Sequence, residues 1–85
     1  MVPNKDIARS SSLEVVRLLR KERIRRKISL NRLAEKADLS RSMVSYVERG
    51  MRNPTIDTLF RIAGALDIDL WRMIKRASKR SDVKR

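Results

Sequence analysis

The chain has 85 residues, with 22 lysine and arginine residues against 10 acidic ones and a formal net charge of +12. It contains no cysteine and no histidine, which excludes a disulfide framework and removes the usual zinc ligands, so we expect neither a metal nor a cofactor. The length allows one domain with one small core, and no segment resembles a membrane span or a signal peptide. We therefore expect a soluble, cytoplasmic protein with a polyanionic partner.

Charge alone leaves the nature of this partner open. Nucleic acid, an anionic membrane surface and an acidic protein are all compatible with a net charge of +12. A basic helix such as Arg17 to Lys27 could in principle lie on a membrane. The pattern of the remaining elements has to decide between these partners.

The first element along the chain is an expected flexible N-terminal arm, residues 1–12, which has no sustained apolar period and ends in three serines. A first helix is expected over about 13–27, with Ser11 or Ser12 as its cap. Its inward flank combines apolar side chains with one arginine: Val15, Val16, Leu19, Arg23 and Ile24.

Capping residues mark the next three expected helices. Ser29 precedes a helix over 30–37, Ser40 precedes one over 41–49, and Thr55 precedes one over 56–66. Gly50 ends the third helix as a left-handed residue. The expected inward residues are Leu33, Ala34 and Ala37 in the second helix, Met43, Val44 and Val47 in the third, and Ile56, Leu59, Phe60, Ile62, Ala63 and Leu66 in the fourth.

A fifth helix is expected from Leu70 to about Ser78, which completes a domain over 13–78, and residues 79–85 are expected to be a basic disordered tail. Because Leu70 and Met73 should face the core, Trp71 and Ile74 turn outward and predict a dimer interface. The alternative is that Trp71 lies over the edge of its own domain. The basic segment from residue 75 onward either touches phosphates or is a solvated end.

The second and third expected helices are joined by the three-residue turn Asp38-Leu39-Ser40. Two short helices joined in this way form a helix-turn-helix, in which the second helix is free to enter a groove of DNA. The outward positions of this helix are all hydrogen-bonding residues: Arg41, Ser42, Ser45, Tyr46 and Arg49. The pattern favours a DNA-reading face over an ordinary solvated one.

Several segments together resemble the Cro/repressor-type (XRE) helix-turn-helix family over about residues 13–77. They are Leu33 to Ala37, Ser40, Val44-Ser45, Glu48 to Gly50, Arg52 to Thr55 and Leu59 to Leu66. The resemblance implies an all-α, five-helix lambda-repressor-like domain with a helix-turn-helix, which binds double-stranded operator DNA as a homodimer with its third helix in the major groove.

The resemblance also implies roles for individual positions. Base reading falls to Arg41, Ser42, Ser45 and Tyr46, and Arg41 is expected to contact guanine O6 and N7. Contacts to the DNA backbone are expected from Ser29, Arg49, Arg52 and Asn53. Arg23 and Glu48 match an internal ion pair that ties the first helix to the recognition helix, the alternative being two solvated surface charges.

The chain departs from the family at three positions. Lys27 and Asp38 stand where relatives often have glycine, and lysine tolerates a left-handed backbone less well than aspartate. Leu30 stands where relatives often have a glutamine that contacts phosphate, which puts that contact in doubt here.

No catalytic constellation is present, because Asp57, Asp67 and Asp69 occupy cap and helix-start positions. We expect a non-enzymatic transcriptional regulator without a small-molecule effector. A phage-type repressor, a restriction-modification controller and an antitoxin-like protein that neutralises a partner and represses its own operon all remain open. The regular apolar pattern disfavours a membrane or RNA binder that depends on charge alone.

Overall fold

The computed structural model describes the backbone of residues 5–82 and the side chains of residues 11–79. Five α-helices and no β-strand make up this described part, as predicted. The helices are α1 (Lys5–Arg25), α2 (Leu30–Ala37), α3 (Arg41–Glu48), α4 (Ile56–Ala65) and α5 (Leu70–Asp82). Within this part of the chain, no helix is both long enough and apolar enough to cross a membrane.

The starts of the three middle helices lie where the sequence predicts them. Ser29, Ser40 and Thr55 each have an extended backbone, and each side-chain oxygen accepts a hydrogen bond from the backbone N–H three residues later, at 3.0 to 3.1 Å. These bonds satisfy N–H groups that have no partner inside the helix. The caps thereby fix α2, α3 and α4 in register with the sequence.

The two outer helices are longer than predicted. α1 begins at Lys5, so most of the segment expected to be a flexible arm is helical, and Ser11 and Ser12 lie inside the helix instead of capping it. α5 continues to Asp82, four residues beyond the expected end at Ser78. Residues 1–4 of the expected arm and 83–85 of the expected tail lie outside the described residues.

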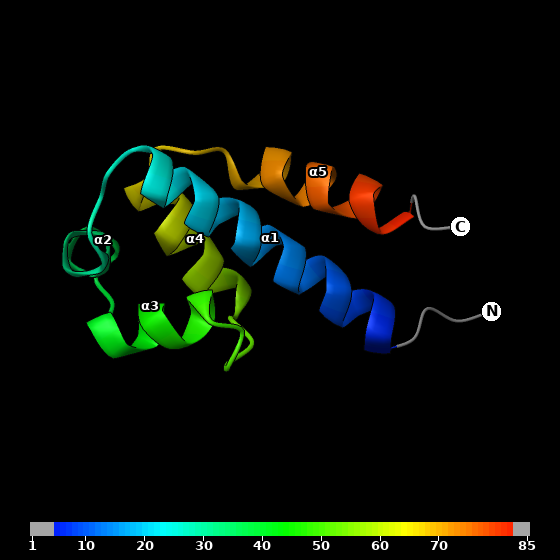
Figure 1. The fold of residues 1–85 in the computed structure, drawn as a ribbon, viewed down its shortest axis with the longest axis horizontal. Helices are drawn as coiled ribbons and strands as arrows, with labels where there is room; N and C mark the ends of the chain where they lie inside the picture. Colours follow the sequence, from blue (N-terminus) through cyan, green and yellow to red (C-terminus); the bar gives the residue numbers. More distant parts are fainter. Residues whose placement is uncertain (1–4, 83–85) are drawn as a thin grey trace.

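The two longer helices pack against each other. α1 and α5 run antiparallel, side by side, along the long axis of the molecule, so the first turn of α1 and the last turn of α5 lie at the same end (Figure 1). No other pair of helices shares as extensive a contact in the described structure. Serine disfavours a helix interior only weakly, so Ser11 and Ser12 do not prevent α1 from beginning earlier in the chain.

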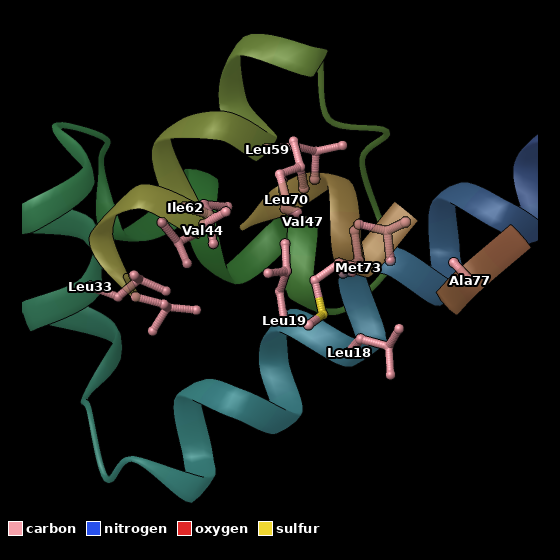
Figure 2. Close-up of a cluster of buried hydrophobic side chains, with 14 of the residues drawn as sticks. Leu18, Leu19, Leu33, Val44, Val47, Leu59, Ile62, Leu70, Met73 and Ala77 are labelled. Atoms are coloured by element: carbon pink, nitrogen blue, oxygen red, sulfur yellow. The ribbon is translucent and has the colours of Figure 1, made fainter. Parts of the chain in front are cut away.

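All five helices enclose one core, part of which is shown in Figure 2. Its most deeply buried large side chains are Leu33, Val44, Val47 and Leu66. The core also contains Leu18, which the sequence reading did not assign to it.

Three residues expected in the core are exposed instead: Ile24, Ile56 and Phe60. Ile24 follows the buried Leu19 by five residues, which turns it about 140° around the helix. On α4 the apolar face is wider than the surface that neighbouring helices cover, so Ile56 and Phe60 remain outside.

Turns after the helices use a left-handed backbone at four positions. Gly50 has a φ of 71°, as expected for the residue that ends α3. Lys27, Asp38 and Asp67 have φ values of 56°, 59° and 62° without being glycine. Lys27 and Asp38 therefore adopt a backbone geometry that favours glycine, although a side chain makes this geometry costly by roughly 1–2 kcal/mol per residue.

Candidate nucleic-acid interface

The helix-turn-helix is formed by α2, the turn at residues 38–40 and α3. The turn is closed by the backbone N–H of Leu39, which donates to the carbonyl of Ala34 at 2.9 Å. On its inner side α3 is anchored by Val44 and Val47, both almost fully buried. Because an eight-residue helix is unstable by itself, these two valines and the cap fix its position. Figure 1 shows α3 along one edge of the molecule.

The four predicted base-reading residues all lie on α3. Arg41, Ser42 and Tyr46 are exposed, whereas Ser45 is half-buried. The exposed three bring a guanidinium, a hydroxyl and a phenol to one accessible surface, a set that can both donate and accept hydrogen bonds.

The predicted backbone-contacting residues lie at the two ends of the helix-turn-helix. The guanidinium carbon of Arg49 lies 5.8 Å from the centre of the Tyr46 ring. Arg52 approaches the sulfur of Met43 at 3.9 Å, and Asn53 is exposed in the same loop. At the start of α2, the oxygen of Ser29 accepts from a backbone N–H, a bond that leaves its own O–H able to donate.

The structure brings Arg23 and Glu48 together in a bidentate ion pair. Nε and Nη2 of Arg23 donate to the two carboxylate oxygens of Glu48 at 2.7 and 3.0 Å. A third donor, Nη1, binds the carbonyl of Ile28 at 2.7 Å. Only 12% of the Arg23 side chain and 8% of the Glu48 side chain are exposed. The reading of these residues as two solvated charges therefore does not fit, and the pair links α1 to the end of α3 and to the segment before α2.

A second set of ion pairs, which the sequence pattern did not predict, connects α4 with the turn of the helix-turn-helix. Nε of Arg61 donates to a carboxylate oxygen of Asp57 at 2.8 Å, and its Nη1 lies 3.6 Å from the carboxylate of Asp38. The hydrogen bond that Arg61 donates to the Asp57 carboxylate is the main cause of a raised pKa for Arg61. Spacing on one helix predicts the Asp57 contact, but no local pattern predicts the contact with Asp38.

The predicted dimer residues Trp71 and Ile74 differ in their surroundings. Trp71 is 63% exposed, and its ring meets that of Phe60 edge to face, with centroids 5.8 Å apart. Ile74 is half-buried against the core, so it turns outward less than expected, and its place in a dimer interface stays a prediction. The exposed residue that accompanies Trp71 is Phe60 from α4, and Ile56 lies one turn before Phe60 on the same helix.

Comparison with known proteins shows to which protein family the chain belongs. Residues 19–70, more than half of the chain, match the pattern of a helix-turn-helix family, and the chain belongs to this family. The resemblance to the Cro/repressor-type (XRE) group that the sequence shows is thereby confirmed.

Individual relatives are regulators by name. The immunity repressor protein of Bacillus phage phi105 is 46% identical over 55 residues, which is 65% of this chain and 36% of the repressor. An uncharacterized HTH-type transcriptional regulator of Mycobacterium tuberculosis strain H37Rv is 37% identical over 59 residues, 69% of this chain and 42% of that protein. The chain thus spans less than half the length of these curated relatives.

The fold is also found in a solved structure. A crystal structure of a tyrosine-to-phenylalanine mutant of the restriction-modification controller protein C.Esp1396I superposes with a TM-score of 0.71 at 27% identity. The likeness covers 86% of this chain and 94% of the controller.

Proposed function

We propose that the chain is a sequence-specific, double-stranded-DNA-binding transcriptional regulator that inserts α3 into the major groove of an operator. The observation that carries this proposal is the two-sided construction of α3, whose inner side is fixed by Val44 and Val47 while Arg41, Ser42 and Tyr46 stand exposed. Membership of the helix-turn-helix family, relatives named as repressor and transcriptional regulator, and the net charge of +12 support it.

Binding to random duplexes followed by selection tests the proposal directly. At physiological salt, we expect a defined operator-like sequence to be enriched, since base contacts add specificity to the electrostatic attraction. Enrichment of no sequence at all would contradict a regulator of this kind.

In the proposed complex with DNA, two arginines make different kinds of contact. Arg41, at the exposed N-terminal end of α3, reads a base, whereas Arg52, in the loop after α3, holds a phosphate. We expect Arg41→Ala to cost roughly 1–3 kcal/mol at one operator position and to relax preference there. Arg52→Ala should weaken binding to all sequences alike and reduce the salt slope by about 1.

Fluorescence anisotropy on a panel of single-base operator variants at several salt concentrations measures both effects. Arg25→Ala, an exposed arginine outside the helix-turn-helix, serves as the control for charge removal. The division of roles is overturned when Arg41→Ala and Arg52→Ala change affinity equally at every operator variant.

We further propose that the regulator is a homodimer that places one α3 in each of two half-sites about one DNA turn apart. The exposed aromatic pair of Phe60 and Trp71, with Ile56 on the same side of α4 as Phe60, supplies the apolar surface for this dimer. Large exposed aromatic residues are enriched at protein interfaces.

A further inference from the structure

The outer face of α5 carries a stripe of four basic side chains that the helix-turn-helix does not use. Arg72, Lys75, Arg76 and Lys79 follow one another at spacings of three, one and three residues, which places them on one side of the helix. All four are exposed, and together with Met73 they line a groove of about 460 Å³. None of the four forms an ion pair with any side chain that the structure describes. We call these four residues the α5 stripe.

The α5 stripe points away from α3. It lies on the side of the helix opposite the buried residues Leu70 and Ala77, through which α5 packs on the rest of the domain, and the buried Met73 borders it. The neighbours of α5 are α1 and α4, and Figure 1 shows α3 on the far side of these helices. A straight duplex seated on α3 therefore lies on the other side of the molecule from the α5 stripe.

The chemistry of the α5 stripe suits phosphates better than a folded protein partner. Protein interfaces depend on buried aromatic and apolar anchors and contain few lysines, but two of the four stripe residues are lysines. Trp71, the exposed aromatic residue of α5, lies against Phe60 and outside the stripe. The stripe extends about 10 Å along the helix, and duplex DNA presents one phosphate charge per about 1.7 Å of its axis. Flexible basic side chains over this length can contact several phosphates without reading bases.

We propose that the α5 stripe is a second, sequence-independent binding face for double-stranded DNA, by which the protein joins the duplex held by α3 to a second duplex segment. The inference rests on the proposed function for the first duplex only. The second contact is made with phosphates, so it acts on DNA of any sequence and weakens steeply as salt rises.

A bridging experiment tests this. One duplex, containing a sequence selected by the protein, is fixed on beads, and a labelled duplex of unrelated sequence is added with the protein at 50 to 200 mM salt, a range over which contacts of this kind weaken by orders of magnitude. The stripe variant carries Arg72→Gln, Lys75→Gln, Arg76→Gln and Lys79→Gln together. The matched control carries Arg17→Gln, Lys21→Gln, Arg25→Gln and Lys27→Gln, which removes the same charge from exposed positions on α1 and the turn after it, outside the helix-turn-helix.

We expect the wild-type protein and the matched control to retain the labelled duplex on the beads. At the lowest salt, the stripe variant should retain at least about tenfold less labelled duplex than the wild-type protein. The reason is that four phosphate contacts correspond to a slope of about −3.6 for log affinity against log salt. Its sequence preference for the selected duplex alone, measured by anisotropy, should be unchanged. A variant with Arg72→Lys and Arg76→Lys keeps the charge and should still bridge.

Three results would overturn the inference. If the stripe variant and the matched control lose retention of the labelled duplex equally, the effect depends on the total charge of the protein and not on the stripe. Bridging that persists in the stripe variant and is lost with Arg41→Ala indicates that two α3 helices hold the two duplexes. Displacement of the labelled duplex by polyglutamate at lower charge concentration than by competing duplex indicates an acidic protein partner.

The experiment also separates this inference from the proposed function. Binding of the selected duplex without retention of the labelled one overturns the α5 stripe and leaves the regulator intact. Equal binding of selected and unselected duplexes on the beads contradicts the sequence-specific regulator, and the stripe is then judged by retention alone.

Discussion

The guanidinium of Arg23 makes three hydrogen bonds within the protein, two with the carboxylate of Glu48 and one with the carbonyl of Ile28. A nearly buried carboxylate such as that of Glu48 is costly unless it is paired and hydrogen-bonded. Arg20 lies farther away, with its Nε 3.6 Å from the same carboxylate and its side chain largely exposed. Arg23 is therefore the main partner of Glu48.

Removal of Arg23 is expected to destabilise the fold strongly. We expect Arg23→Ala to lower the free energy of unfolding by about 3–5 kcal/mol, because it leaves the Glu48 carboxylate buried without its main partner. Urea denaturation followed by circular dichroism measures the change. Arg25→Ala is the control, since Arg25 forms an exposed pair with Glu22 that is worth at most about 1 kcal/mol.

A double substitution shows whether Arg23→Ala lowers stability because Glu48 is left as a buried, unpaired charge or because packing contacts of the arginine are lost. Arg23→Met with Glu48→Leu removes both charges and should recover much of the stability that Arg23→Ala loses, since apolar side chains replace such pairs at little cost. Additive losses in the Arg23 and Glu48 single and double variants would mean that the two residues do not act as a pair.

At the scale of the elements, the turn between α1 and α2 holds a lysine in a conformation that favours glycine. Lys27 has a φ of 56°, and its own N–H donates to the carbonyl of Ile24 at 2.9 Å. The turn also places the Ile28 carbonyl where Arg23 binds it. The left-handed backbone of Lys27 thus helps to hold α2 in place, because it positions the carbonyl that Arg23 binds.

Replacement of Lys27 by glycine should stabilise the domain. Relief of the left-handed strain, roughly 1–2 kcal/mol, exceeds the entropy that glycine adds to the unfolded chain, roughly 0.5–1 kcal/mol, so we expect a net gain of about 0.5–1 kcal/mol. Lys21→Gly, at an exposed position within α1, is the control and should cost about 1 kcal/mol. Urea denaturation measures both, and loss of stability in Lys27→Gly would show that the lysine side chain contributes more than its backbone costs.

The helices also show that structural features that depend on nearby residues can be predicted from the sequence. The starts of α2, α3 and α4 were predictable because Ser29, Ser40 and Thr55 act on N–H groups only three residues away. Most of the face of α3 was also predictable, since periodicity within one short helix separates Val44 and Val47 from Arg41, but Ser45, expected outside, is half-buried.

Features that depend on distant contacts were not predictable from local patterns. α1 packs against α5, more than 50 residues later in the chain, and no signal near Lys5 indicates the early start of α1. Phe60 belongs to an apolar face by periodicity, but its exposure depends on which neighbours cover α4. The link from Arg61 to Asp38 likewise joins segments that only the fold brings together.

At the scale of the whole molecule, the described residues form one small domain with one helix-turn-helix, so the proposed function gives each protomer one recognition helix. The described backbone has principal extents of only 41 × 21 × 18 Å. Two protomers that bind adjacent half-sites gain affinity without any new DNA contact, since the second half-site is bound at a high effective concentration. In the proposed homodimer, the strength of the dimer contact is therefore expected to control operator affinity at low protein concentration.

Trp71→Ala should weaken the homodimer. A large aromatic residue at the centre of an interface is worth about 2 kcal/mol or more, so we expect a dimer dissociation constant raised roughly 30-fold, measured by sedimentation equilibrium. Phe60→Ala should act in the same direction because its ring supports that of Trp71. Met51→Ala is the control, since Met51 is as exposed as Trp71 but lies in the loop after α3. Operator affinity should fall at nanomolar protein and recover at concentrations that restore the dimer. A Trp71→Ala protein that dimerises as tightly as Met51→Ala would place the interface elsewhere on the surface.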